Sequence, residues 1–409
     1  MSYVPGQPPP LPPLTATFSG ARGEFFRLVS RGAAIELITL GFYRFWLATD
    51  IRRHLWVNTA IDGDAAEYTG RGKELLIGFL FAMAILVPIY LAYFLIGVEA
   101  ERYQGFASVP LVIAFYAFGQ FAIYRARRYR LTRTVWRGIR FWMDGSGWAY
   151  AGRAMLWTLL AVLTLGLAWP WRAAALERYK MRHSHYGDLS GDFEGRGWEF
   201  FKKAKYLWSA PSIVALILGL FVVATMQSDR VASFWMLASG IFGILSLVLL
   251  PLLPFIYAWF KAVEWRWWLS GIRVGDVRLD STLPGNAFFG LYWKLIGWMT
   301  LLLVIYVAYM IGVFALLERL VGKGADGLPQ LDAVMNHVGL MVGLGLGYIA
   351  LILSANVAMR MYLVRDMWAT VLDTVEVHGI EAMANVGAKG DLASALGEGF
   401  ADGLDVAGF

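Results

Sequence analysis

Residues 38–56 read ITLGFYRFWLATDIRRHLW, and the same pattern returns 125 residues later as LTLGLAWPWRAAALERYKM at residues 163–181. In the same register, GRGKE at residues 70–74 returns as GRGWE at residues 195–199. Chance rarely keeps one register over about thirty-five residues, so the chain contains an internal duplication. Both copies lie beside long apolar runs, and internal repeats are a common plan of membrane transport proteins.

The composition is typical of a membrane protein. Hydrophobic residues make up 58% of the chain and charged residues 16%, with a mean hydropathy of +0.54, whereas soluble domains carry about 25% charged residues. The net charge of +6 comes from Lys and Arg beside apolar runs, where the positive-inside rule places them. We therefore expect no nucleic-acid binding. The absence of cysteine excludes disulfides, thiolate metal sites and a cysteine nucleophile.

Six apolar runs are long enough to cross a membrane, which takes roughly 20 residues. They lie at about 75–98, 106–124, 207–225, 234–260, 288–317 and 338–358. The runs form three pairs, and the connection inside each pair is poor in Lys and Arg, whereas the stretches between pairs are rich in both. We therefore expect the basic stretches and both termini on the cytoplasmic side.

Two further apolar segments, residues 29–46 and 154–171, belong to the duplicated pattern. The second carries no charge and is long enough to span, but basic stretches flank it on both sides. The first contains Arg31, Glu36 and Arg44, which a lipid-exposed span tolerates badly. We interpret both as interfacial or re-entrant helices that bend at the Thr-Leu-Gly step. The alternative is eight full spans.

These patterns predict an all-α polytopic membrane protein with about six transmembrane helices in three pairs, two re-entrant or interfacial helices, and internal repeats. Asp-Gly steps at 62–63 and 144–145 predict small cytoplasmic β-hairpins. The expected organisation is a disordered Pro-rich lead at 1–17, repeat units at 18–140, 141–273 and 274–384, of which the third is degenerate, and a flexible tail at 385–409.

Several motifs occur together and in order between about Phe18 and Val377. They are Thr39-Leu40-Gly41 with Tyr43 and Trp46, Arg52-Arg53, Asp62-Gly63, Tyr68-Thr69-Gly70, Arg133-Thr134, Trp136-Arg137-Gly138-Ile139-Arg140-Phe141, and Thr164-Leu165-Gly166 with Pro170-Trp171. This set resembles the YjgN family of bacterial inner-membrane proteins, whose function is unknown. The resemblance implies a polytopic protein of the bacterial inner membrane and carries over no catalytic residue.

Polar residues inside apolar segments are the first candidates for a site, because ionisable groups there usually serve a function. Glu36, Lys294 and Asn356 are predicted to contact a substrate or a proton, with Glu36 as the leading candidate. The competing interpretation of Glu36 is a salt bridge to an Arg of a basic stretch. Lys294 also suits a position from which it snorkels to the membrane interface.

The two Gly-Arg-Gly phrases are the second candidate. Arg71, Lys73 and Arg196 lie where a helix is expected to begin, and such a place can hold an anion between backbone N–H groups and a basic side chain. The phrases are not Walker motifs. The competing interpretation is that these residues meet the phosphates of lipid headgroups.

No catalytic or cofactor motif is present. There is no Gly-x-Ser-x-Gly sequence and no His-Glu-x-x-His sequence. His183 and His185 are the only pair with a ligand-like spacing, and two residues do not make a metal site. We therefore predict no catalytic residues, no metal and no cofactor, and we rank a lipid-directed enzyme last.

The sequence leaves two functions open. The first is a transporter or channel for a small solute or lipid, which the repeats, the Gly- and Pro-interrupted apolar segments and Glu36 favour. The second is a non-enzymatic membrane scaffold that binds a partner such as a membrane-associated protease or an envelope complex. Membrane lipids are expected partners in either case. The sequence does not determine the oligomeric state.

Overall fold

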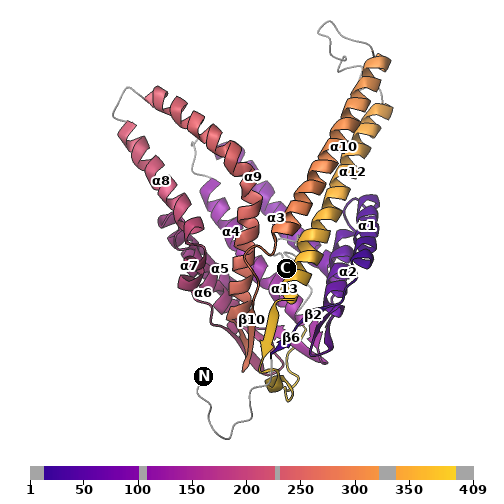
Figure 1. Cartoon of the computed structure of the whole chain (residues 1–409), viewed down its shortest axis with the longest axis vertical. Coiled ribbons are helices and arrows are strands. Elements are labelled where there is room, and N and C mark those ends of the chain that lie inside the picture. Colours follow the sequence, from indigo (N-terminus) through magenta and orange to yellow (C-terminus); the bar gives the residue numbers. More distant parts are fainter. Residues whose placement is uncertain (1–12, 101–107, 226–230, 322–337, 393–409) are drawn as a thin grey trace.

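The computed structural model describes residues 13–100, 108–225, 231–321 and 338–392, and helices dominate it (Figure 1). The prediction of an all-α fold is nevertheless wrong, because eleven short strands form one antiparallel sheet in the order β1-β11-β10-β9-β8-β7-β6-β5-β4-β3-β2. The strands are β1 (Leu14–Thr15), β2 (Thr17–Phe18), β3 (Thr59–Ile61), β4 (Asp64–Tyr68), β5 (Thr134–Trp136), β6 (Ile139–Met143), β7 (Ser184–Tyr186), β8 (Leu189–Phe193), β9 (Ile272–Val274), β10 (Val277–Ser281) and β11 (Val375–His378).

The sheet closes on itself like a barrel. Its two terminal strands, β1 and β2, are separated along the chain only by Ala16. The strand β1 pairs with β11, while β2 pairs with β3. The backbone N–H of Ala16 donates to the carbonyl of Val375, 3.2 Å away. One short extended segment therefore joins both edges of the sheet, which removes exposed strand edges.

Ten of the eleven strands, β2 to β11, and the helices around them form five copies of one unit. Each unit runs from one strand through two or more helical segments to a second strand. The helices are α1 (Arg22–Ile38) and α2 (Arg44–Val57) in the first unit; α3 (Gly72–Ala100) and α4 (Ser108–Thr132) in the second; α5 (Gly147–Leu163) and α6 (Trp169–Arg182) in the third; α7 (Gly197–Lys203), α8 (Lys205–Thr225) and α9 (Val231–Gly271) in the fourth; and α10 (Phe289–Val321), α12 (Val338–Met359), η2 (Arg360–Asp366) and α13 (Met367–Leu372) in the fifth.

One backbone hydrogen bond recurs in every unit and fixes which residues are equivalent. In it, the residue after the first strand donates its N–H to the carbonyl of the last residue before the second strand. The five bonds are Ser19 to Asn58 (3.0 Å), Thr69 to Arg133 (2.8 Å), Asp144 to His183 (3.0 Å), Glu194 to Gly271 (2.9 Å) and Thr282 to Thr374 (3.1 Å). The expected repeats at 18–140 and 141–273 therefore each hold two such units, and 274–384 holds one.

Tight hairpins link consecutive units. Asp62 and Gly63 both have positive φ between β3 and β4, as a two-residue hairpin turn of this type requires, so this predicted hairpin is confirmed. The second predicted turn is wrong, because Asp144 and Gly145 follow β6 and lead into α5. The hairpin of that region is made instead at Arg137 and Gly138, between β5 and β6.

The prediction of six transmembrane helices is also wrong. Helices occupy all six expected regions, but within the described residues only three segments are long and apolar enough to cross a membrane. They are Gly72–Phe94 in α3, Phe289–Leu316 in α10, and Met341–Leu372, which begins in α12 and continues to the end of α13. By length and composition these three segments fit a membrane protein.

The duplicated segments 29–46 and 154–171 are helix–turn–helix pairs. Both ends of each pair lie at the sheet, because α1 and α2 are flanked by β2 and β3 and α5 and α6 by β6 and β7. The turn between α1 and α2 is made by Leu40 (φ 52°) and Gly41 (φ 89°). Thr39 accepts a hydrogen bond from the N–H of Tyr43 at 3.0 Å and so holds the turn. The predicted bend at the Thr-Leu-Gly step is therefore a tight reversal.

The second glycine of each Gly-Arg-Gly phrase is needed for close packing. A Cβ on Gly72 would lie 2.8 Å from Cα of Trp46, and a Cβ on Gly197 would lie 2.7 Å from Cα of Trp171. These contacts bring the start of α3 against α2 and the start of α7 against α6. Because the obstacle is backbone, it cannot rotate away, so the phrase has a structural reason that is independent of any ligand.

The interior of the closed sheet is filled with side chains. One hydrophobic cluster includes Trp136, Tyr186, Phe193, Val277 and Val377, which come from five different strands. The short helix η3 (Ile380–Met383), which follows β11, adds further apolar side chains to the same cluster. The sheet is therefore a packed core and not a pore.

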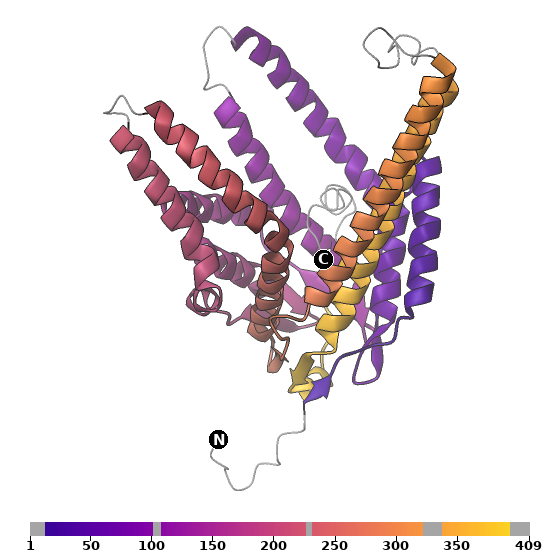
Figure 2. The same ribbon diagram turned by 45° about the horizontal axis from the view of Figure 1, so that its top comes forward.

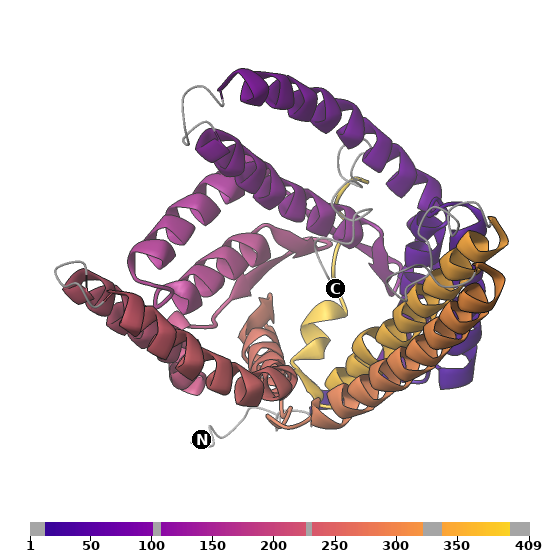
Figure 3. The same cartoon turned by 90° about the horizontal axis from the view of Figure 1, so that it is seen from above.

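The helices lie on one side of the sheet and spread apart with distance from it. Seen from above, the helix pairs are arranged in a ring (Figure 3). The helices α3 and α4 touch near the sheet through Ala82, Ala122 and Ala126 and diverge beyond that contact (Figure 2). By contrast, α10 and α12 stay side by side along their length.

Candidate functional site

A polar cleft of about 690 Å³ lies at the base of the fourth unit. Its lining comes from α6 (Arg178, Arg182), β8 (Asp192, Phe193), the connection that follows (Glu194, Gly195, Arg196), α7 (Glu199, Lys203), α9 (Trp267, Ser270, Gly271) and β9 (Arg273). Five of these residues are basic and three are acidic. The cleft therefore carries an excess of two positive charges and is suited to an anion.

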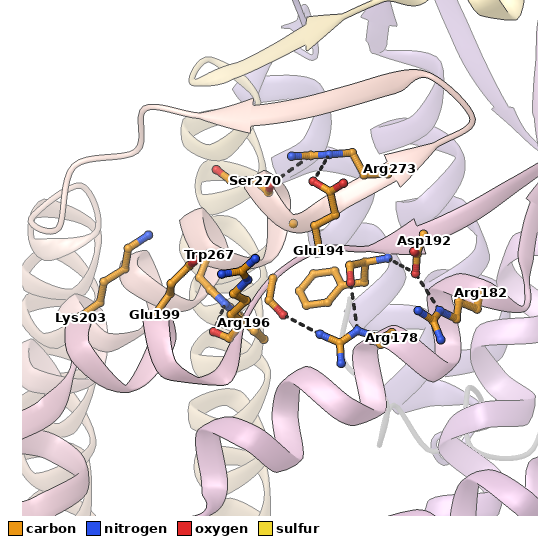
Figure 4. Close-up of a pocket in the computed structure, with 13 residues that line it drawn as sticks. Arg178, Arg182, Asp192, Glu194, Arg196, Glu199, Lys203, Trp267, Ser270 and Arg273 are labelled. Carbon is orange, nitrogen blue, oxygen red and sulfur yellow. Dashed lines mark hydrogen bonds and ion pairs between the residues drawn. The ribbon is translucent and has the colours of Figure 1, made fainter.

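Part of this charge is already paired inside the cleft. Arg182 Nε donates to Asp192 Oδ1, and Arg273 Nε donates to Glu194 Oε2, both at 2.9 Å (Figure 4). Arg178 donates to the carbonyl of Gly195, 3.3 Å away. Burial would raise the pKa of Asp192, but the backbone N–H of Phe193 and the guanidinium of Arg182 outweigh it and lower this pKa. These side chains are fixed, and the three arginines against two carboxylates leave one positive charge on this side of the cleft.

Arg196 and Lys203, against Glu199, supply the second positive charge of the excess. Neither side chain makes a hydrogen bond or ion pair with any described residue. Lys203 lies on α7 four residues after Glu199, and both line the cleft (Figure 4). Burial lowers the pKa of Lys203, and Arg266 lowers it further, while Glu199 partly opposes them. An anion placed next to Lys203 and Arg196 would give both side chains a partner and would raise the pKa of Lys203.

Exposed aromatic and apolar side chains lie on α7, which lines this cleft, and on α8, which follows it. Trp198 and Tyr206 are strongly exposed, and Lys202 and Lys205 lie over their rings. Further along α8, exposed aliphatic residues follow, among them Ile213, Val214 and Leu216. Aromatic residues beside lysines, followed by an aliphatic helix, are typical of the headgroup level of a membrane protein.

The first Gly-Arg-Gly phrase has a different environment. Arg71 and Lys73 are exposed, and neither lines the cleft of the fourth unit. The place is closed by Arg133, whose Nε donates to Glu74 Oε2 at 2.9 Å, and by Tyr129, whose hydroxyl donates to the same oxygen at 2.8 Å. Of the three predicted anion-binding residues, Arg196 lines this cleft, and Arg71 and Lys73 do not.

The structure places Glu36 beside an arginine of the last unit. Its Oε2 lies 3.5 Å from Arg360 Nη2, at the start of the π-helix η2. Asn356 lies four residues before Arg360, and its Oδ1 is buried without a hydrogen bond to any described residue. Lys294 is exposed on α10 and makes no hydrogen bond or ion pair with the described residues. Of the three predicted residues, Glu36 and Asn356 therefore lie near one arginine, and Lys294 stands apart.

A buried ionic group on α6 was not predicted. Glu177 forms ion pairs with Lys180 and, at 3.4 Å, with Arg127, and it accepts the indole N–H of Trp268 at 3.1 Å. Burial raises the pKa of Glu177, but Lys180 and Arg127 outweigh it and lower the pKa overall. Because α4, α6 and α9 each contribute, the group ties three helices together. Nothing in the local sequence distinguishes Glu177 from an exposed glutamate.

The two histidines have other partners. His183 ends α6, and its Nδ1 lies 2.8 Å from the carbonyl of Tyr179. His185 stacks on Trp142, and its Nε2 lies 3.5 Å from Asp144 Oδ1. No group of three or more possible ligands gathers anywhere in the described residues. The histidines are used in packing at the sheet.

A family model described as a bacterial protein of unknown function (DUF898) matches residues 13–403. The chain belongs to this family. The match confirms the resemblance seen in the sequence between about Phe18 and Val377. The match is longer than that resemblance, since it begins before the first strand of the sheet and ends after the last. No curated protein and no solved structure matches the chain. Membership brings no activity with it, so the function has to be argued from the cleft and the helices.

Proposed function

We propose that this protein moves an anionic lipid or a similar amphiphile across or along the membrane. The observation that carries the proposal is that the helix α7 contributes Lys203 to the cationic cleft and Trp198 to an exposed aromatic surface. Arg196 and Lys203 face a cavity at the base of α7, and exposed aromatic and aliphatic side chains begin at Trp198 and continue along α8. An amphiphile needs these two surfaces side by side, one for its headgroup and one for its chain.

The packed sheet decides where such a path would run. Since one hydrophobic cluster occupies the sheet interior, a solute has no route along its axis. The helices instead diverge from a common base (Figure 2) and carry exposed apolar side chains on α3, α10 and α12. A path along helix surfaces suits a lipid, whose acyl chains stay in contact with the bilayer, better than it suits an ion.

We place the sheet on the cytoplasmic side of the bacterial inner membrane, together with both termini. Basic residues concentrate where the helices meet the sheet, as with Arg127, Arg178 and Lys203. The first and last described strands, β1 and β11, pair with each other in that sheet. The positive-inside rule supports this orientation.

The test is lipid movement in vesicles that contain the purified full chain. Vesicles carry a trace of fluorescent anionic or zwitterionic lipid, and dithionite bleaches the outer leaflet. We expect faster loss of the protected fluorescence for the anionic lipid, and a rate at least threefold lower in an Arg196→Gln/Lys203→Gln variant. An Arg71→Gln/Lys202→Gln variant removes the same charge outside the cleft and serves as the control.

Two results would overturn the proposal. One is bleaching at the rate of empty vesicles for every lipid headgroup. The other is native mass spectrometry of protein from its own host that shows a stoichiometric protein partner and no lipid, which would favour a scaffold.

A further inference from the structure

The cleft lies where another unit of the same chain holds an arginine. The recurring backbone hydrogen bond makes Gly271 of the fourth unit equivalent to Arg133 of the second. The same register makes Trp267 equivalent to Tyr129. The duplication makes Glu199 equivalent to Glu74. The cleft of the fourth unit can therefore be compared, residue by residue, with the equivalent part of the second unit.

In the second unit the place is filled by a side chain. Arg133 lies between Glu74, which it contacts at 2.9 Å, and the ring of Tyr129, whose centroid is 5.2 Å from its guanidinium carbon. The Arg133 side chain is only 7% exposed. The negative charge of Glu74 is thus matched from within the chain.

In the fourth unit the matching groups are missing. Gly271 has no side chain to offer, and the indole N–H of Trp267 donates to the carbonyl of Arg196 at 3.2 Å instead of to Glu199. A Cβ at position 271 would lie 2.4 Å from the ring of Phe193. Since Phe193 is buried in the sheet core, the packing itself keeps a larger residue out and the cleft open.

The fourth unit has also gained basic residues around this place. Lys203 stands where the second unit has Gly78, and Arg273 stands where it has Val135. In the neighbouring third unit, Arg182 stands where the first unit has Val57. The second unit therefore has one internal ion pair where the fourth unit has an open cleft with an excess of two positive charges.

We propose that the cleft binds a phosphomonoester dianion. A monoester phosphate carries close to two negative charges near neutral pH and presents three acceptor oxygens, which matches the excess charge of the cleft. A phosphodiester carries one charge and leaves two such oxygens. Arg196 and Lys203 donate to the phosphate, and the adjacent apolar surface of α8 selects a lipid as its source. The lipid source rests on the proposed function, whereas the phosphate chemistry does not.

The experiment measures binding to the full chain in detergent micelles. The probes are short-chain phosphatidic acid (a lipid monoester), short-chain phosphatidylglycerol (a lipid diester) and inorganic phosphate. We expect phosphatidic acid to bind at least tenfold more tightly than phosphatidylglycerol. Lys203→Gln and Arg196→Gln should each weaken phosphatidic acid binding about tenfold, as the loss of a charge-assisted hydrogen bond does.

The chain supplies matched controls for both variants. Lys202→Gln removes the same charge from the neighbouring residue of α7, which lies over Trp198 and not in the cleft. Arg71→Gln removes the charge equivalent to Arg196 in the unit that Arg133 fills. Both controls should leave the affinity within about twofold of the unchanged protein.

A variant of Glu199 tests whether the ligand in the cleft is an anion or a cation. Glu199→Gln removes a negative charge from the cleft and should tighten phosphatidic acid binding. Weaker binding would mean that the ligand presents a cation in place of Arg133, which overturns the inference. Equal losses in Lys202→Gln and Lys203→Gln would also overturn it, because binding would then be diffuse electrostatic attraction.

The three probes distinguish the proposal of a phosphate site from the proposal of lipid movement. If inorganic phosphate binds as tightly as phosphatidic acid and responds to the same variants, the phosphate site stands and the lipid function fails. If phosphatidylglycerol binds as tightly as phosphatidic acid, the monoester inference fails while lipid movement remains supported.

Discussion

Replacing Arg133 with Met would remove the charge that matches Glu74 while keeping most of the side-chain volume. Arg133 Nε lies 2.9 Å from Glu74 Oε2, and the Tyr129 hydroxyl donates to the same oxygen at 2.8 Å. The Arg133 side chain is 7% exposed and that of Glu74 is 26% exposed. The variant therefore leaves a largely buried carboxylate with one neutral donor.

The expected loss of stability follows from that geometry. Breaking a buried ion pair by removing one partner costs about 3–5 kcal/mol. Because a quarter of Glu74 is exposed and Tyr129 still donates, the lower end applies, about 3 kcal/mol. The double variant Glu74→Met/Arg133→Met removes both charges and should recover at least about 2 kcal/mol of that loss.

The assay is equilibrium unfolding by SDS in mixed micelles, followed by tryptophan fluorescence, for the two single variants and the double variant. Glu199→Met is the control, since Glu199 occupies the equivalent position without an ion pair, and it should change stability by less than about 0.5 kcal/mol. A single Arg133→Met variant as stable as the unchanged protein would refute the reasoning, as would a double variant that loses the sum of the two single losses.

Three further predictions concern the turn, the cleft and the ion pair between the first and last units. Gly166→Ala, at φ 94°, should lower the free energy of unfolding by about 1 kcal/mol, because alanine is strained at positive φ. Leu165→Gly, at φ 51°, should raise or preserve it. Thermal unfolding that shows a more stable Gly166→Ala variant or a less stable Leu165→Gly variant would contradict the strained turn. Binding of phosphatidic acid should become tighter with pH as the monoester loses its second proton near pH 6. It should weaken again when Lys203 loses its charge, at a pH below the ordinary lysine pKa of 10.5, because the pKa of Lys203 is lowered. Affinity that stays constant beyond pH 10.5 in the unchanged protein, or the same loss of affinity at high pH in a Lys203→Gln variant, would contradict the role of Lys203. Glu36→Gln should cost no more than about 1 kcal/mol, since its pair with Arg360 is 3.5 Å long and partly exposed; if lipid movement falls more than tenfold at unchanged stability, Glu36 acts on the substrate or a proton.

The sequence predicted local structure well where the duplication applied. The helices α1 and α5, and likewise α2 and α6, begin and end at positions that differ by 125 residues, as the aligned phrases require. The reversal at Leu40 and Gly41 could be predicted because the Thr-Leu-Gly step occurs in both copies. Such features depend on residues close together in the chain.

The sheet could not be predicted in the same way. Its strands are two to five residues long, too short to show a clear alternation of apolar and polar residues. The pairing that closes it joins Leu14 to Val377, and no local pattern indicates a contact over that separation. Only the turn at Asp62 and Gly63 was visible, because its residue types are specific to hairpins.

The cleft was predicted in part. Arg196 was selected from the Gly-Arg-Gly phrase, but the same argument selected Arg71, in whose unit Arg133 fills the equivalent place. The difference is made by Gly271 and Arg133, and these are recognised as equivalent only through the hydrogen bonds of the sheet. A comparison of the aligned copies alone could have found Lys203, because it stands at the position of Gly78.

In a duplicated chain, the differences between the copies carry more functional information than the shared phrases. The shared glycines Gly72 and Gly197 are explained by close packing against Trp46 and Trp171, which both copies need in order to fold. The fourth unit departs from the second in several ways at one place: a helix that stops at Lys203 instead of continuing, new basic side chains, and a glycine where an arginine had satisfied Glu74. Independent drift would scatter such changes over the unit. Their convergence on one cleft supports the proposal that the fourth unit binds a ligand at this place, while the second unit has an internal ion pair there with a structural role.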